Sequence, residues 1–203
     1  MNLGVTNNGT LAALVILNDV LDLSKLEAGK MQLEKIPFRI QEIAENVVIT
    51  LRHKAEEKGL KLETIIDQHV PEFVKGDPSR LYQVLINLVD NAIKYGKQGG
   101  LIESSFYKVD GARVLIEISD DGAGIAEEHL NRIFERFYRT DLARSRKVGG
   151  SGLGLAICKH IIEAHDQSIH VRSKIDVGST FGFTLQSRKD HTTKAADSAS
   201  PVT

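Results

Sequence analysis

The stretch Gly149-Gly150-Ser151-Gly152-Leu153-Gly154-Leu155 opens a helical pattern that continues to His165. Its glycines let the backbone approach a ligand closely, and the first turn of a helix offers free N–H groups to an anion. The stretch therefore favours a phosphate site, although a flexible lid hinge would have the same composition. No Gly-Lys-Ser/Thr follows and no strand directly precedes it, which excludes a Walker loop and a dinucleotide-binding turn.

A second glycine-containing turn lies upstream at Ser119-Asp120-Asp121-Gly122-Ala123-Gly124-Ile125, directly after the apolar stretch 114–118. A carboxylate at a strand end can accept a hydrogen bond from an exocyclic amine such as adenine N6. The neighbouring glycines would let a flat base lie against the backbone. The alternative is an ordinary strand-to-helix turn, which Asp and Gly also favour.

Polar side chains share one face of the helix predicted over 79–95. Asn87 and Asn91 are four residues apart, and Lys94 follows one turn later. Amide oxygens suit a hard cation such as Mg²⁺, and a lysine suits phosphate. Two solvated asparagines are the alternative. The opposite face is apolar and is expected in the core: Leu81, Leu85, Leu88 and Ala92.

Two further motifs flank the glycine-rich stretch. Residues 132–139 form an aromatic and basic cluster in which Arg136 or Arg139 could face phosphates, and 136–150 lacks periodicity, as expected of a mobile loop. Residues 178–183 read as a turn into the last strand. Surface arginines and a plain hairpin turn are the respective alternatives.

The hydrophobic periodicity predicts a mixed α/β (α+β) chain. Helices are expected at 10–34, 41–58, 79–95, 127–134 and 152–165, and strands at 60–67, 73–75, 101–109, 113–119, 168–173 and 180–185. The hairpin-type connections predict a two-layer sandwich, a mixed sheet with helices on one face, preceded by one long amphipathic helix.

Composition excludes several classes of protein. The 203 residues carry 26 Lys and Arg against 27 Asp and Glu, a formal net charge of −1, which argues against a general nucleic-acid binder. The single cysteine, Cys158, excludes an internal disulfide framework and a cysteine-rich zinc site. No apolar run of 18 residues occurs, so we expect no membrane span and a cytoplasmic chain, even for a membrane-anchored parent.

In their order and spacing, these motifs resemble the N, G1, F, G2 and G3 boxes of the ATP-binding domain of bacterial sensor histidine kinases. The resemblance implies a Bergerat-type fold with ATP beneath a lid at 140–150. It also implies three parts: 1–34 as a remnant of the second helix of the dimerisation and phosphotransfer domain, 35–187 as the ATP-binding catalytic domain, and 188–203 as a disordered tail.

The resemblance assigns the phosphate end of the site. Asn91 would ligate Mg²⁺, and Asn87 would lie beside the phosphates. Lys94 and Arg139 would act on phosphate. The expected catalytic side chains are those of Asn87, Lys94 and Arg139. The glycine-rich stretch would present backbone N–H groups to the phosphates from Gly152, Leu153 and Gly154. The lid would approach the γ-phosphate together with Arg139, and Gly150 is also expected to bind the nucleotide.

The resemblance also assigns the adenine end. Asp120 would bind adenine N6, with Tyr95 near the base and Thr180 near both. The base pocket would be shaped by Gly122, Gly124 and Ile125. The implied reaction moves the γ-phosphoryl group of ATP to a histidine and then to a response-regulator receiver domain, in a parent that is a homodimer.

The chain departs from the family in its histidines. None of the seven precedes His53, and His165, although followed by Asp166, ends the helix after the glycine-rich stretch. The phosphoacceptor helix is therefore missing, and we expect Mg·ATP binding without autophosphorylation on histidine. Two alternatives remain open: another ATPase of the same fold, and a nucleotide-binding or interaction module without catalysis.

Overall fold

The computed structural model describes residues 33–111, 113–140 and 151–187. The predicted tail at 188–203 and Gly150 lie outside the described residues, as does the predicted helix at 10–34 up to residue 32. The elements are β1 (Ile36–Arg39), α2 (Ile40–Glu57), β2 (Lys61–Ile66), β3 (Phe73–Gly76), α3 (Pro78–Tyr95), β4 (Leu101–Asp110), β5 (Arg113–Asp120), α4 (Glu127–Leu130), α6 (Gly154–Ala164), β6 (Ile169–Lys174) and β7 (Gly178–Gln186).

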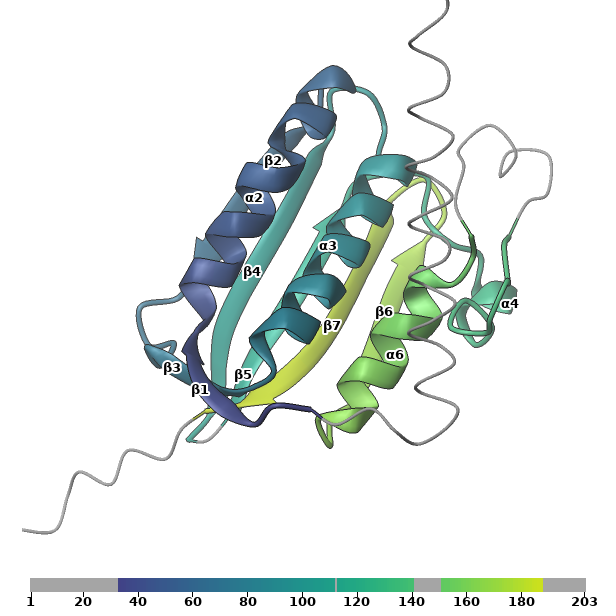
Figure 1. Ribbon diagram of the computed structural model, residues 1–203. Coiled ribbons are helices and arrows are strands. Elements are labelled where there is room, and N and C mark those ends of the chain that lie inside the picture. Colours follow the sequence, from purple (N-terminus) through teal and green to yellow (C-terminus); the bar gives the residue numbers. More distant parts are fainter. Residues whose placement is uncertain (1–32, 112, 141–150, 188–203) are drawn as a thin grey trace, which may run out of the picture.

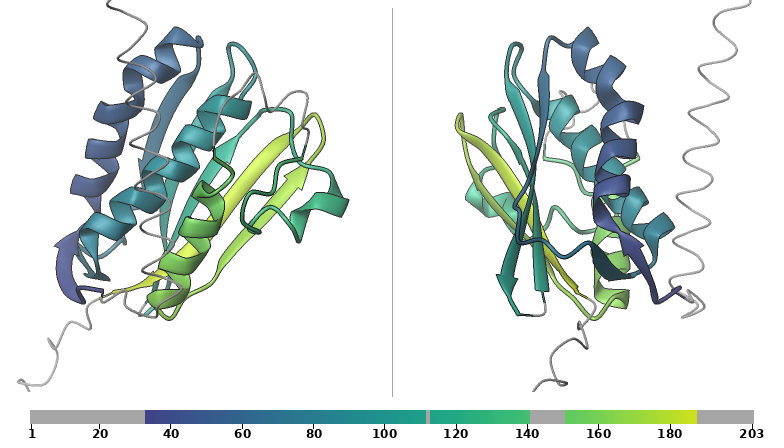
Figure 2. Two further views of the ribbon diagram at one scale, coloured as in Figure 1. Left: turned by 45° about the vertical axis from the view of Figure 1, so that its right-hand side comes forward. Right: turned by 90° about the vertical axis from the view of Figure 1, so that its left-hand side faces the viewer.

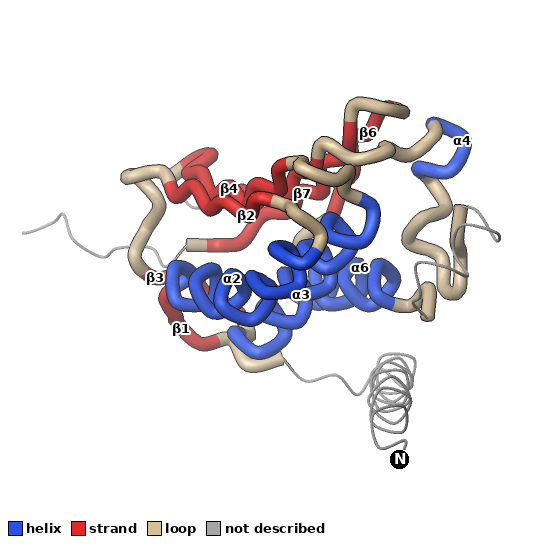
Figure 3. The backbone as a smooth tube through the Cα atoms, turned by 90° about the horizontal axis from the view of Figure 1, so that it is seen from above, coloured by secondary structure: helices blue, strands red, loops and turns tan. Residues whose placement is uncertain are grey.

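A five-stranded sheet in the order β2-β4-β5-β7-β6 forms one layer (Figure 1). Only the β2–β4 pair is parallel, and the other three pairs are antiparallel. Helices α2, α3 and α6 cover one face of the sheet, which Figure 2 and Figure 3 show from the side and from above. The predicted two-layer sandwich is confirmed.

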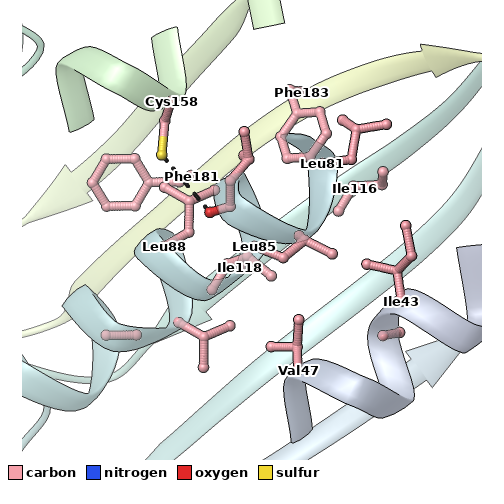
Figure 4. Packing of buried hydrophobic residues seen from close by; sticks show 14 of the residues in the cluster. Ile43, Val47, Leu81, Leu85, Leu88, Ile116, Ile118, Cys158, Phe181 and Phe183 are labelled. Carbon is pink, nitrogen blue, oxygen red and sulfur yellow. Dashed lines mark hydrogen bonds between the residues drawn. The ribbon is translucent and has the colours of Figure 1, made fainter. Parts of the chain in front are cut away.

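The core lies between the two layers because each element turns one apolar face inward. Helix α3 begins at Asp77, whose carboxylate accepts the N–H of Arg80 at 3.0 Å, and Pro78 occupies its first turn. The alternate residues of β5 and β7 meet the helices, as Figure 4 shows. The labelled residues of that packing are Ile43, Val47, Leu81, Leu85, Leu88, Ile116, Ile118, Cys158, Phe181 and Phe183. Cys158 is fully buried there, as its apolar neighbours in sequence predict.

Three sequence predictions need correction. Strand β1 was not predicted: it pairs antiparallel with β3, far along the chain, and leads directly into α2. The helix predicted over 127–134 ends at Leu130, and turns follow. The helix predicted from residue 152 begins at Gly154, because Gly152 has a φ of +74°. Within the described residues, no helix is long and apolar enough to span a membrane.

Candidate functional site

A cavity of about 430 Å³ opens between the last turns of α3, the start of α6, and the ends of β5 and β7. It is lined by Asn87, Asp90, Asn91, Ala92, Lys94, Tyr95, Asp120, Gly124, Ile125, Ile133, Tyr138, Arg139, Thr140, Ser151, Gly152, Gly154, Leu155, Ser179 and Phe181. Ten predicted site residues are among them, drawn from four segments that are distant in the sequence.

The polar face of α3 forms one wall of this cavity. Asn87, Asn91 and Lys94 all line it, as their helical spacing predicts, and Tyr95 follows at the end of the helix. The side-chain nitrogen of Asn87 is buried and has no hydrogen-bond partner among the residues that the structure describes. A buried donor without a partner is costly, so this amide fits a wall that receives a polar ligand.

Asp90, on the same wall, was not among the predicted site residues. Its carboxylate pairs with Lys94, at 2.8 Å between Oδ2 and Nζ, and through Oδ1 with Lys54 of α2. Burial by itself would raise the pKa of Asp90, but hydrogen bonds from both lysines outweigh it and keep that pKa below its ordinary value. The predicted phosphate-binding lysine is therefore held by a carboxylate here.

Asp120 ends β5 at the opposite side of the cavity. Its Oδ1 accepts the N–H of Gly122 at 2.9 Å. Burial raises the pKa of the Asp120 carboxyl above its ordinary 3.8, although hydrogen bonds from the backbone N–H groups of Gly122 and Ser179 act in the opposite direction. Gly122 is not among the residues that line the cavity, but it donates this hydrogen bond, and a Cβ there would overlap the carbonyl oxygen of Tyr95.

The turn after Asp120 is held against the β6–β7 hairpin. Gly124 has a φ of +70°, and a Cβ there would overlap the carbonyl oxygen of Lys174, so the close approach requires glycine. The N–H of Ile125 donates to Ser173 Oγ at 2.8 Å, and the N–H of Asp176 donates to the Ala123 carbonyl at 2.9 Å. Gly124 and Ile125 are thereby presented to the cavity.

On β7 the structure places Ser179 and Phe181 in the cavity, and not Thr180. Successive residues of a strand point to opposite faces of the sheet. The hydroxyl of Thr180 lies 2.9 Å from that of Ser119 instead. Thr180 is therefore not among the residues that line the cavity, and its place near the adenine stays a prediction.

The glycine-rich stretch closes the remaining side. Gly152 and Gly154 line the cavity, and the carbonyl of Gly152 accepts the N–H of Phe137 at 2.9 Å, two residues before the cavity residue Arg139. A Cβ on Gly152 would lie only 2.9 Å from Phe137 Cα. Leu153 is fully buried, and its N–H donates to Ser151 Oγ at 3.2 Å, so it does not line the cavity.

The side chains that line the cavity fit a cation that takes most of its ligands from water and a bound phosphate group. Within residues 33–111, 113–140 and 151–187, no group of three His, Cys, Asp or Glu side chains could hold a metal ion. Mg²⁺ is commonly bound by one or two protein oxygens together with water and substrate phosphates. The amide of Asn91 in the cavity wall is compatible with that mode.

The family model for the histidine kinase-, DNA gyrase B- and HSP90-like ATPases matches residues 76–189, which include every element that lines the cavity. The chain belongs to this ATPase family. Its curated relatives include the signal transduction histidine-protein kinase BarA of Escherichia coli, 42% identical over 84% of this chain. The sensor histidine kinase GacS of Pseudomonas protegens is 36% identical over 90% of this chain.

Solved structures of this ATPase family share the fold. Full-length ShkA in complex with AMPPNP superposes with a TM-score of 0.77 and 30% identity, over 88% of this chain and 36% of that one. ThkA in complex with the response regulator TrrA has a TM-score of 0.64 and 26% identity, over 87% and 51% of the respective chains. The chain spans 19% of BarA and 20% of GacS.

Several cavity residues were not predicted as site residues, although four of them lie within the motif stretches 132–139 and 178–183. Ile133, Tyr138 and Phe181 are aromatic or aliphatic side chains of a kind that also fills cores. Ser179 would have been found by fixing the strand register, since it pairs with Asp120 across β5 and β7. Asp90 is adjacent to Asn91 in the sequence, but its two lysine partners become visible only in the packed structure.

Proposed function

We propose that this chain is the ATP-binding catalytic domain of a sensor histidine kinase, which transfers the γ-phosphoryl group of ATP to a histidine in a two-component pathway. The observation that carries the proposal is that one cavity is lined both by a partly buried carboxylate, Asp120, and by the polar face of α3. The kinases among the relatives favour this function over the two alternatives left open by the sequence.

At the adenine end, Asp120 would accept a hydrogen bond from the exocyclic amine of the base. Its carboxylate is partly buried and already positioned by the N–H of Gly122, so little ordering is left for the ligand to supply. Gly124, Ile125 and Phe181 would form the apolar surroundings of the ring, with Tyr95 at the exposed side.

At the phosphate end, the cavity gathers cationic and amide groups. Lys94 and Arg139 would stabilise the charge of the phosphates, and the Asn87 amide would donate to a phosphate oxygen. Asn91 would be a ligand of Mg²⁺, which when bound neutralises phosphate charge. Gly152 and Gly154 would let the backbone approach the phosphates at the start of α6.

The phosphoryl acceptor would be supplied by a histidine on a separate helix. Within this chain, His165 is the only histidine followed directly by an acidic residue. It is 8% exposed, its Nε2 accepts the N–H of Asp77 at 3.0 Å, and its Nδ1 lies 2.7 Å from the Ile161 carbonyl. Both ring nitrogens are therefore occupied, which supports nucleotide binding by this chain without autophosphorylation.

The partners follow from the same proposal. They are a helix carrying the phosphoacceptor histidine and a response-regulator receiver domain, within a homodimeric parent protein. The complex of ThkA with the response regulator TrrA supports the second partner. Because ATP is the donor, we propose that the domain works in the cytoplasm, also where a parent protein is anchored in a membrane.

Calorimetric titration of the full chain with AMPPNP and Mg²⁺ tests the proposal. We expect saturable one-site binding, weakened about tenfold or more in Asp120→Asn, because the adenine amine loses its charged acceptor. Asp110→Asn is the matched control, since its carboxylate pairs with Arg113 at 2.6 Å on the exposed β4–β5 turn. No binding by the folded chain, or equal binding by Asp120→Asn, would contradict the proposal.

A further inference from the structure

Lys54 lies on α2, outside every motif and outside the cavity lining, yet it reaches the nucleotide wall. Its ammonium group pairs with Oδ1 of Asp90, while Nζ of Lys94 lies 2.8 Å from Oδ2 of the same carboxylate. One anion is therefore shared by two cations, and two of these three groups, Asp90 and Lys94, line the cavity.

This cluster is more than a surface ion pair. The side chains of Asp90 and Lys94 are 20% and 24% exposed, and that of Lys54 is 48% exposed. Charges that are partly withdrawn from water interact more strongly and are costlier to leave unpaired. A movement of Lys94 away from Asp90 would therefore depend on what else neutralises the carboxylate.

Helix α2 also holds the backbone of this region. Lys58, one turn after Lys54, donates from Nζ to the carbonyl oxygens of Ile93 and Lys94, at 2.8 Å each. Lys58 thus fixes the last turn of α3, while Lys54 acts on the side-chain pairing within it. The backbone of Lys94 is therefore held by Lys58, whereas the pairing of its ammonium group depends on Lys54.

We propose that Lys54 is a positioning residue that sets how readily Lys94 leaves Asp90 for a phosphate group of the nucleotide. The inference rests on the proposed nucleotide binding. Asp90 and a phosphate are both anions and compete for the same ammonium group. Because Lys54 also pairs with the Asp90 carboxylate, the attraction between Asp90 and Lys94 is weaker. Lys54 also keeps the carboxylate paired after Lys94 has turned away.

The consequence is specific to phosphate. Without Lys54, Lys94 would leave an unpaired, partly buried carboxylate behind, and binding of a triphosphate would have to overcome that cost. Adenosine has no phosphate and would not contact the Lys94 ammonium group, so it should bind equally well with and without Lys54. Removal of the Asp90 charge would release Lys94, and Lys54 would then have no role.

The test compares two ligands by calorimetric titration of the full chain: AMPPNP with Mg²⁺, and adenosine. Lys54→Met is expected to weaken AMPPNP binding about threefold to tenfold and to leave adenosine binding within about twofold. Lys54→Arg, which keeps the charge, should restore AMPPNP affinity. Lys159→Met is the control, because it removes an i,i+4 pair with Glu163 on α6 at 3.8 Å.

The Asp90→Asn background provides the second arm. Asp90→Asn should bind AMPPNP at least as tightly as the parent chain, and adding Lys54→Met should change nothing further. Equal weakening of both ligands by Lys54→Met, or the same effect with and without Asp90, would overturn the positioning role. A parent chain that binds neither ligand would overturn the proposed function, whereas normal binding with an unaffected Lys54→Met variant would overturn this inference alone.

Discussion

At the scale of single residues, Asp120 combines a place in the cavity wall with an expected cost to the stability of the fold. Its carboxylate is partly buried and carries a raised pKa, because burial penalises the charged form. The same carboxylate lines the cavity, and within the described part of the chain its charge is stabilised by the backbone N–H groups of Gly122 and Ser179. Burial of a charged group is unfavourable for stability, which is consistent with the ligand-binding role proposed for Asp120.

This gives a prediction with a definite sign. A pKa that is higher in the folded chain than in the unfolded chain means that the folded chain binds the proton more tightly, so ionisation of Asp120 lowers stability as pH rises above 3.8. Asp120→Asn should therefore raise the free energy of unfolding at pH 7 by about 0.5–1 kcal/mol, in the absence of nucleotide. The gain should shrink as the pH falls towards 3.8.

Urea unfolding of the parent chain and Asp120→Asn between about pH 3 and pH 8 measures this difference, with pH values on both sides of the expected transition. Asp110→Asn, on the exposed turn, should show no such gain. A destabilised Asp120→Asn at pH 7 would mean that the hydrogen bonds to the carboxylate outweigh its burial, and the interpretation would be wrong.

At the scale of elements, the β6–β7 hairpin positions the turn after β5. Ser173 is the centre of this contact: its Oγ accepts the N–H of Ile125, donates to the Gly178 carbonyl, both at 2.8 Å, and lies 2.9 Å from Ser179 Oγ. Two of these neighbours, Ile125 and Ser179, line the cavity. The hairpin therefore braces the proposed adenine end without contacting the ligand through Ser173.

Ser173→Ala should lower both stability and affinity. It leaves the Ile125 N–H and the Gly178 carbonyl without their partner, which is expected to cost about 1–3 kcal/mol of unfolding free energy. AMPPNP and adenosine should lose affinity by the same factor, because only the base pocket loosens. Ser173→Thr, which keeps the hydroxyl, is the control. Unchanged affinity for both ligands in a destabilised Ser173→Ala would limit Ser173 to a purely structural role.

Local patterns predicted the parts of the site that lie within one element. Asn87, Asn91 and Lys94 share a helix face by spacing alone, and Asp120 stands at the end of an apolar strand. Pairings between distant segments were not accessible in the same way. Strand β1 exists through its pairing with β3, and the choice of Ser179 over Thr180 follows from the register of β7 against β5. The Lys54–Asp90 pair likewise depends on how α2 packs on α3.

At the scale of the whole molecule, the site is assembled by the packing of the two layers. The sheet contributes Asp120, Ser179 and Phe181, and the helical layer contributes the walls from α3 and α6. The segment that contains Arg139 joins them through the hydrogen bond of Phe137 to Gly152. Helix α3 contributes Tyr95 to the proposed adenine end and Lys94 to the proposed phosphate end, but Asp120 comes from the sheet. Nucleotide binding should therefore report on the integrity of the packing between the two layers.

The last prediction concerns the acceptor. Incubation of the full chain with γ-labelled ATP and Mg²⁺ should give no acid-labile, base-stable label, because the only histidine that is followed directly by an acidic residue, His165, is buried with both nitrogens hydrogen-bonded. The same chain should phosphorylate a separate helix fragment that supplies an exposed histidine followed by an acidic residue, if Lys94 and Arg139 position the γ-phosphate. His165→Gln is the control for stray labelling. A stable label on the parent chain that disappears in His165→Gln would show that α6 opens far enough to expose this histidine, and it would refute the separation of donor and acceptor proposed for this domain.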